Sequence, residues 1–292
     1  MKKIFIKICK LLGFEIIDQN KFSSPTLNKE LNEDLSTFNK KSIILPLGEV
    51  KITRKVNKLL IIVRVNTTIE VWDQNKKRLF EHPKIDYTIR SINSLIRSIN
   101  VCKKKYPNLI IKTILVDDHS SEENLNKIMN IIINENIEIV ALDNAKYNLK
   151  IKKQKTKETF SNLSSLLKSF EIGKEKGEDL IFFLEDDYLH SESMLEEIIS
   201  SYERISSQIG KDIFMCPSDY PYLYMNNEKT NILIGSKRHW RTINKTLCTF
   251  LTSKNLLENY WENFQKTCED RHEPFEKYLN EIYEKEICIS PI

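Results

Sequence analysis

From about residue 59 onward, the hydrophobic pattern alternates between two periods. Short runs of consecutive β-branched and aromatic residues are typical of strands that are buried on both faces. Between these runs, apolar residues recur every three or four positions, as they do over 85–99, and this spacing predicts helices. The alternation predicts an α/β fold with a mostly parallel central sheet and helices on both faces. The four predicted strands cover residues 59–65, 110–116, 137–142 and 179–184.

After Gly210 this alternation gives way to shorter segments. Before that point, Ser193 and Glu196 form the pattern of a capping box and predict the start of a helix. The later segments are predicted as two short strands and two helices. They cover 212–216, 231–234, 256–264 and 275–283.

The first residues suggest a surface helix. Over residues 1–14 the apolar run is interrupted by Lys7 and Lys10, which excludes both a signal-peptide core and a membrane span. In a helix these lysines share one face, and Ile4 and Ile8 share another. Such a helix either lies on the anionic inner face of a membrane or packs on its own domain.

Composition removes several classes of function. The 292 residues include only 6 glycines, and neither G-x-G-x-x-G nor G-x-x-x-x-G-K-[ST] occurs, so a glycine-rich phosphate loop is excluded. The net charge of +4 is too small to indicate a nucleic-acid partner. The 6 cysteines include no C-x-x-C pair, which favours reduced thiols in a cytoplasm.

Acidic residues follow three of the predicted strands. Asp117 and Asp118 end the second, Asp143 follows the third, and Glu185-Asp186-Asp187 (185–187) follows the fourth. The carboxyl ends of parallel strands meet at one edge, where open α/β sheets bind ligands. Clustered carboxylates need a neutralising cation, and Mg²⁺ or Mn²⁺ prefers oxygen ligands and bridges to phosphates. The cluster therefore predicts a metal–nucleotide site, although Asp118 taken alone also fits a turn former or a helix N-cap.

Two of these segments resemble motifs of a known family. Residues 114–121, ILVDDHSS, resemble the V-D-D-x-S segment of GT-A fold glycosyltransferases, especially those of family 2. Residues 182–188, FFLEDDY, resemble their D-x-D metal motif in a Glu-Asp-Asp variant. The resemblance covers about Leu59 to the C-terminus and implies a GT-A type fold, with an N-terminal helical arm outside it.

The resemblance also implies an organisation of the chain. Residues 18–42 are polar without a sustained period and are expected to form a linker or an irregular arm. We expect an N-terminal amphipathic helix and arm over 1–57 and a glycosyltransferase domain over 58–292. That domain would consist of a nucleotide-binding half, 58–190, and an acceptor half, 191–292.

In the nucleotide-binding half, the resemblance implies residues that hold the donor. The base and ribose would be bound by the end of the first strand, the loop that follows it and the V-D-D segment. The matching residues are Arg64, Thr67, Asp117 and Asp118.

The metal motif and the catalytic base are implied in the same way. Asp187 would coordinate Mn²⁺ or Mg²⁺ bound to the donor diphosphate, and Glu185 and Asp186 would contact the ribose or a metal-bound water. The family carries an acidic catalytic base at the start of a later helix, which points first to Asp270 and then to Glu269. The next candidate is Glu273, and the acidic segment also fits an ordinary helix N-cap.

Together these features predict a metal-dependent glycosyltransferase. A carboxylate would take the proton of an acceptor hydroxyl, and the oxygen would displace the nucleoside diphosphate, with inversion implied by the resemblance. The expected partners are a UDP-sugar donor and a saccharide or lipid-linked acceptor, in the cytoplasm or at the inner face of its membrane. The alternative is a catalytically silent GT-A-like protein that binds a nucleotide or glycan. The position of the last histidine, His272, ahead of the last predicted helix supports that alternative, and the acidic trio speaks against it.

One further segment lies in the expected acceptor half. Arg238-His239-Trp240-Arg241 (238–241) combines aromatic and guanidinium groups that suit sugars and phosphates. A core tryptophan flanked by surface cations explains the same pattern.

Overall fold

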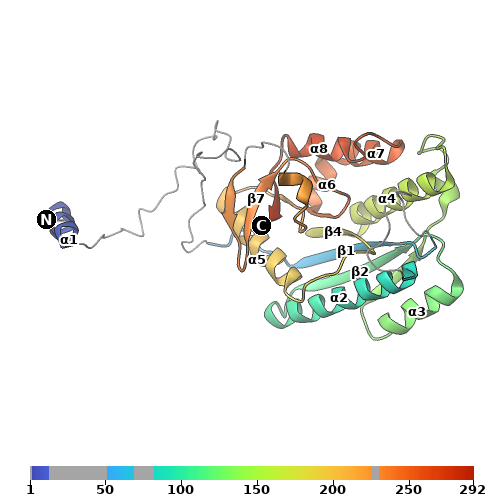
Figure 1. Cartoon of the computed structure of the whole chain (residues 1–292), viewed down its shortest axis with the longest axis horizontal. Coiled ribbons are helices and arrows are strands. Elements are labelled where there is room, and N and C mark those ends of the chain that lie inside the picture. Colours follow the sequence, from blue (N-terminus) through green and yellow to red (C-terminus); the bar gives the residue numbers. More distant parts are fainter. Residues whose placement is uncertain (1, 13–50, 69–81, 225–229) are drawn as a thin grey trace.

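Nine strands form one sheet in the computed structural model, which describes residues 2–12, 51–68, 82–224 and 230–292 (Figure 1). The strands are β1 (Lys58–Val65), β2 (Ile110–Asp117), β3 (Ile137–Ala141), β4 (Leu180–Glu185), β5 (Phe214–Met215), β6 (Ile232–Ile234), β7 (His239–Ile243), β8 (Phe250–Ser253) and β9 (Cys288–Pro291). Their order is β3-β2-β1-β4-β8-β5-β9-β7-β6. β7 and β8 are antiparallel to both of their neighbours, and the other strands share one direction. The mostly parallel sheet is confirmed.

Helices cover both faces of this sheet (Figure 1). On one face lie α2 (Lys84–Lys105), α3 (Glu122–Ile132) and α5 (Met194–Ile209). On the other face lie α4 (Lys157–Lys176), α6 (Lys254–Asn259), α7 (Trp261–Glu269) and α8 (Lys277–Tyr283). Two 3₁₀ turns, η3 (Asn144–Tyr147) and η4 (Pro221–Tyr224), complete the described elements of the body.

The alternation of side chains along β1 explains why its sequence is continuously apolar. Ile61 and Val63 belong to the core under α2 and α5, and Leu60 and Ile62 belong to the core under α4. All four are almost fully buried, as a central strand with helices on both sides requires. The strands predicted at 59–65, 110–116, 137–142 and 179–184 are confirmed as β1 to β4.

The predicted capping box at Ser193 is wrong in its chemistry. Ser193 does precede α5, but its side chain accepts no hydrogen bond, because its ψ of 4° departs from the extended conformation that capping needs. The Glu196 carboxylate instead pairs with Lys105 and Lys237.

The second half of the chain contributes more of the sheet than the sequence predicts. β8 inserts antiparallel beside β4, with Leu251 opposite Phe182, and β9 lies between β5 and β7. The helix expected over 256–264 is divided at Tyr260 into α6 and α7. The strand predicted over 231–234 is confirmed as β6, and segment 238–241 follows it after a short turn and lies largely within β7. Both halves of the chain thus supply strands to one sheet.

The N-terminal segment forms the predicted helix, α1 (Lys2–Leu11). Most of the arm expected between this helix and residue 57, including all of the segment 18–42, lies outside the described residues. Within the part of the chain that is described, no helix is both long and apolar enough to cross a bilayer.

Candidate functional site

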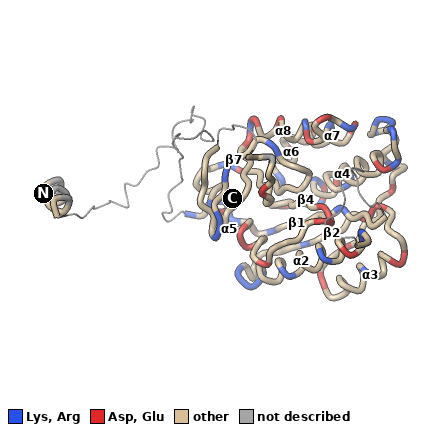
Figure 2. The backbone as a smooth tube through the Cα atoms, viewed as in Figure 1, with Lys and Arg blue, Asp and Glu red and all other residues tan. Residues whose placement is uncertain are grey.

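The strand order places a ligand-binding crevice between β1 and β4. The chain proceeds from β1 to β2 and β3 on one side and then returns to β4 on the other side of β1. In open α/β sheets, ligands bind outside the carboxyl ends of the strands at such a reversal. Figure 2 shows acidic and basic segments close together near these ends. The predicted site residues Arg64 and Glu185 lie directly opposite each other there.

Arg64 and Glu185 form an ion pair at the floor of this crevice. The guanidinium Nη2 donates to Glu185 Oε1 at 2.6 Å, and Nη1 donates to Asn162 Oδ1 at 2.7 Å. Burial raises the pKa of Glu185, and the nearby guanidinium opposes that shift. Arg64 therefore holds a carboxylate in place, which differs from the contact with the base that the resemblance implies.

Asp186 is neutralised in a similar way by the start of α2. Lys84 Nζ lies 2.5 Å from Asp186 Oδ1, and Thr88 Oγ1 donates to Oδ2 at 2.7 Å. The Lys84 and Asp186 side chains are each only 8 % exposed. Both oxygens of this carboxylate are thus committed to the protein's own donors.

Asp187 is the free carboxylate of the trio. Its side chain is exposed, and among the described residues it has no hydrogen bond or ion pair. The described residues also include no group of three His, Cys, Asp or Glu side chains that could hold a metal ion. The trio is therefore not a ready-made cage, because Arg64 and Lys84 already neutralise two of its members. One exposed carboxylate does fit a cation that is held jointly with substrate phosphates.

Asp118 lies at the end of β2 within a network of polar side chains. Its Oδ2 accepts from Asn66 Nδ2 at 3.1 Å, and its Oδ1 accepts from Ser161 Oγ at 2.5 Å. His119 Nδ1 lies 2.8 Å from the same Oδ1, and its φ of 60° is unusual for a residue other than glycine. Such backbone conformations persist where surrounding contacts fix them, often at functional sites.

Asp117 and Thr67 lie beside this network. Ser120 bonds to both, since its N–H donates to Asp117 Oδ2 and its Oγ accepts from the Thr67 N–H, each at 3.3 Å. Asp117 Oδ1 is buried and has no hydrogen-bond partner among the described residues, and burial raises the pKa of this carboxyl. An unsatisfied buried acceptor is costly unless a ligand donor completes it.

The residues predicted as catalytic bases occupy a different environment from the one expected. Asp270 caps the C-terminus of α7 instead of beginning a helix, and Glu269 is the last residue of α7. Asp270 Oδ1 accepts from Gln154 Nε2 at 3.1 Å and from the Arg271 N–H at 2.8 Å. These hydrogen bonds lower its pKa, and Lys152 lowers it further. Asp143 caps the 3₁₀ turn η3, as its local sequence allows.

A cavity of about 360 Å³ opens beside the Arg64–Glu185 pair. It includes a carboxyl that the sequence did not single out, Glu276, at the N-cap of α8. Burial, together with the nearby negative charge of Glu185, raises the pKa of Glu276 to about 7. A carboxyl that titrates near neutrality in a cavity is a candidate general base. The other residues that line this cavity include Asn162, Cys248, His272 and Glu273.

Sequence reasoning missed Glu276 because it placed the helix start too early. Pro274 suits the first turn of a helix, so the acidic residues just before it match the pattern of a helix N-terminus. In the structure α8 begins at Lys277, and Glu276 is its N-cap. The signal that could have found it is a glutamate ahead of Leu279 and Ile282, whose spacing of three positions is that of a helix face.

Comparisons with known proteins add limited information. No protein-family model matches the sequence, and no curated protein matches it. Among solved structures, TarS from S. aureus in complex with UDP-GlcNAc aligns at 14 % identity and a TM-score of 0.41, over 76 % of this chain and 54 % of that one. A structure of the mannosyltransferase Ktr4p from S. cerevisiae aligns at 11 % identity and a TM-score of 0.34, over 83 % of this chain and 66 % of that one.

A second structure, of TarS 1-349 alone, aligns at 15 % identity and a TM-score of 0.37, over 69 % of this chain and 48 % of that one. The chain therefore spans about half the length of the TarS 1-349 structures that align with it.

Proposed function

We propose that the chain is a GT-A type glycosyltransferase that moves a sugar from a nucleoside-diphosphate donor to an acceptor hydroxyl. One arrangement carries the proposal. At the crevice between β1 and β4, the exposed Asp187 is free, while a nearby cavity holds Glu276, whose pKa burial raises to about 7. A free carboxylate for a cation and a carboxyl that titrates near neutrality are what a displacement at a sugar diphosphate needs.

The donor would be held by the polar network at the end of β2. Asp117 Oδ1 is the buried acceptor that an N–H or O–H group of the nucleotide could satisfy. Asp118 and Thr67 lie beside it, and they suit contacts to the base and ribose. We assign Arg64 a positioning role, because its guanidinium is taken up by Glu185 and Asn162.

We propose Asp187 as the protein ligand of Mn²⁺ or Mg²⁺ in the donor complex. When bound, the cation would supply positive charge near the diphosphate leaving group. Glu185 and Asp186 are paired with Arg64 and Lys84, and these ion pairs would fix the backbone that carries Asp187.

The reaction itself would be a single displacement. Glu276, in its ionised form, would accept the proton of the acceptor hydroxyl. The acceptor oxygen would form a bond to the anomeric carbon, the bond from that carbon to the diphosphate oxygen would break, and the nucleoside diphosphate would leave with the electron pair. Inversion would follow from attack opposite the leaving group. Asp270 is the alternative base, although its low pKa makes it the weaker proton acceptor.

A second candidate function is binding without turnover. It is favoured by the lack of a preformed group of three metal-ligating side chains among the described residues. A binding protein would share the nucleotide site with a transferase, but it would not need the general base Glu276.

The test is titration calorimetry of UDP with and without Mn²⁺. We expect Asp187→Asn to lose the binding that depends on Mn²⁺. The matched control Glu192→Gln removes one negative charge from an exposed side chain nearby and should bind as the wild type does. Binding of UDP that is independent of Mn²⁺ and unchanged in Asp187→Asn would exclude the proposed metal ligand.

Turnover is tested with UDP-GlcNAc as the first donor. Release of UDP by the wild type, its loss in Glu276→Gln and its persistence in Asp270→Asn would support Glu276 as the base. The opposite pattern would transfer that role to Asp270. Tight UDP binding without release of UDP from any of the common UDP-sugars would favour the binding protein.

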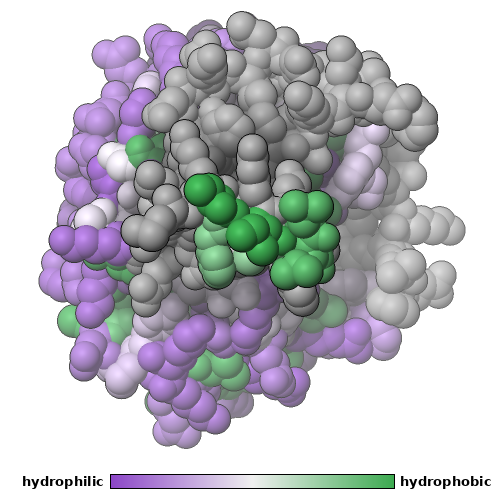
Figure 3. Space-filling view, turned by 90° about the vertical axis from the view of Figure 1, so that its left-hand side faces the viewer, coloured by the Kyte–Doolittle hydropathy of each residue, from purple (hydrophilic) through white to green (hydrophobic). Residues whose placement is uncertain are grey.

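We also propose that the enzyme works at the cytoplasmic face of a membrane, to which α1 attaches. The described apolar side chains of α1 form one patch in the view of Figure 3. Ile4, Phe5 and Leu11 are 64 %, 60 % and 87 % exposed. Four lysines in the same ten residues complement anionic headgroups. The six cysteines are all free, as a reducing compartment requires.

A further inference from the structure

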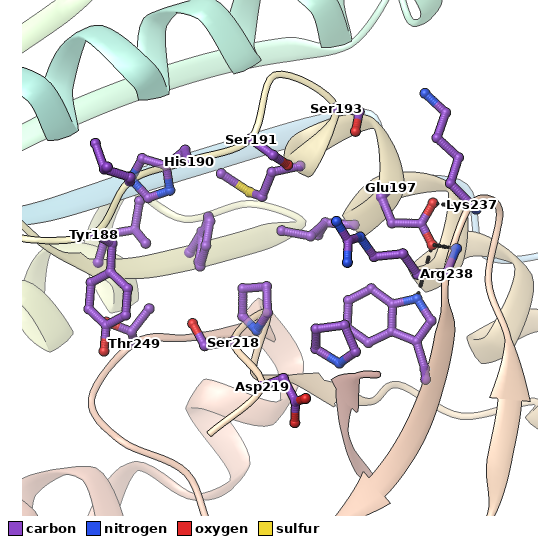
Figure 4. Close-up of a pocket in the computed structure, with 18 of the residues that line it drawn as sticks. Tyr188, His190, Ser191, Ser193, Glu197, Ser218, Asp219, Lys237, Arg238 and Thr249 are labelled. Carbon is purple, nitrogen blue, oxygen red and sulfur yellow. Dashed lines mark hydrogen bonds between the residues drawn. The ribbon is translucent and has the colours of Figure 1, made fainter. Parts of the chain in front are cut away.

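A second cavity has a volume of about 300 Å³ (Figure 4). It is bounded by β4, the segment just after it, α5, the turn between β6 and β7, and the end of β9. Tyr188, which directly follows Asp187, lines it. So does Thr249, whose Oγ1 donates to Glu185 Oε2 at 3.4 Å. The cavity therefore adjoins Glu185, which lines the cavity that holds Glu276.

The acidic residues that line this cavity are already satisfied. Glu197 accepts from the backbone N–H of Lys237 at 2.7 Å and from Trp240 Nε1 at 3.0 Å. Asp219 pairs with Arg241 at 2.8 Å. Neither carboxylate is left to repel an anion or to bind a cation in the cavity.

The contacts of Glu197 also fix the turn between β6 and β7. Its Oε1 accepts further from the backbone N–H groups of Ser236 and Arg238. At Gly235, a Cβ would lie only 2.5 Å from this oxygen, so a glycine is required for the approach. The carboxylate thereby holds the turn, and with it the base of the Arg238 side chain, at the mouth of the cavity.

The basic residues that line the cavity differ in their availability. Lys237 is paired with Glu196 at 2.8 Å. Burial lowers the pKa of His190 to about 4, so its ring is neutral at physiological pH. Arg238 is charged and has no hydrogen bond or ion pair from its side chain within the described part of the chain, and Figure 4 shows this side chain extending toward the cavity. Among the described side chains that line the cavity, the one unpaired charge is therefore positive.

We propose that this cavity binds the acceptor and that Arg238 binds an anionic group, phosphate or carboxylate, on that acceptor. The inference rests on the proposed transferase function, since it places the acceptor beside the trio. A guanidinium offers two parallel N–H donors that match phosphate or carboxylate oxygens, a geometry that a neutral hydroxyl does not use. The substrate class is therefore a saccharide or polyol that carries a negative charge near the accepting hydroxyl.

The test measures binding of three probes in the absence of donor and metal. Glucose 6-phosphate and glucuronate carry the two anionic groups, and glucose is the neutral reference. We expect the wild type to bind at least one anionic probe about tenfold more tightly than glucose, which corresponds to about 1.4 kcal/mol. Arg238→Gln should lose this preference. Arg97→Gln, which removes an exposed arginine on α2 that does not line the cavity, should keep it.

Several results would overturn the inference. They are equal affinity of the wild type for glucose and both anionic probes, no binding of either anionic probe at millimolar concentration, or an unchanged preference in Arg238→Gln. Because the probes are titrated without nucleotide, their result is independent of the UDP titration. Failure of UDP to bind would remove the transferase function and leave the anion preference of Arg238 as measured.

Discussion

Because the pKa of Glu276 is raised in the folded protein, the free energy of unfolding should depend on pH in a way that does not involve activity. Substitution of Glu276 by Gln replaces the carboxyl with a neutral group of similar size. In the folded protein the carboxyl titrates near pH 7, whereas the ordinary value for glutamate is 4.5. A shift of this size corresponds to about 3 kcal/mol of the free energy of unfolding, taken as an upper bound.

The sign follows from where the proton is held. Below pH 4.5 the carboxyl is protonated in both the folded and the unfolded protein, and above pH 7 it is ionised in both. Between these values the folded protein keeps a proton that the unfolded chain has released, so the stability of the wild type falls as pH rises. Glutamine does not ionise, so the stability of Glu276→Gln does not fall with pH for this reason. The variant should therefore match the wild type near pH 4 and exceed its stability by about 1–3 kcal/mol near pH 8.5.

The assay is urea unfolding of both proteins at these two pH values. Glu262→Gln is the control, because it removes the same charge from an exposed position on α7. A difference between Glu276→Gln and the wild type that is the same at both pH values would refute the reasoning. That result would mean that the cavity does not penalise the ionised carboxylate.

Three further predictions concern the pH dependence of transfer, the stability of the fold and the binding of α1 to membranes. The rate of sugar transfer by the wild type should fall about tenfold per pH unit below pH 7, since ionised Glu276 is required; a pH–rate profile measures this. Lys84→Met should lower the free energy of unfolding by about 3–5 kcal/mol, measured by urea unfolding, because it leaves the buried Asp186 uncompensated. Phe5→Ser should weaken binding to anionic vesicles about tenfold in sedimentation assays, and high salt should weaken wild-type binding as well. Binding to neutral vesicles that matches binding to anionic ones would contradict the role of the lysines.

The sheet was predictable where a strand is buried on both faces. β1 and β4 lie next to each other in the sheet and are enclosed by helices, so nearly every residue in them is apolar and the pattern is clear. β7 includes the polar residues His239 and Arg241 alongside its buried apolar residues, so its sequence does not read as an apolar run. β9 is only four residues long and ends in Pro291. Short strands are held by their neighbours in the sheet, and that information is not local.

The sequence predicts where the candidate site lies, but not which of its side chains are paired or how their pKa values are shifted. The acidic residues after β2 and β4 do meet at the end of β1, where Asn66 contacts both Asp118 and Asp186. Their sequence could not reveal that Lys84, 102 positions before Asp186, neutralises that carboxylate from another element. In the same way, a pKa near 7 at Glu276 depends on the closeness of Glu185 and on burial in a cavity that only the fold creates.

The distinction between paired and free charges connects the two cavities. Three adjacent carboxylates suggest that a metal ion is needed to neutralise them. Arg64 and Lys84 already neutralise two of the three. The charge left over is one carboxylate at Asp187, which suits a cation that a diphosphate also holds. On the acceptor side the same accounting leaves one guanidinium, at Arg238, among the described lining residues. Internal pairing thus leaves opposite charges on the two sides of the proposed reaction centre, so that a cation-bound donor and an anionic acceptor would each be directed to a different side.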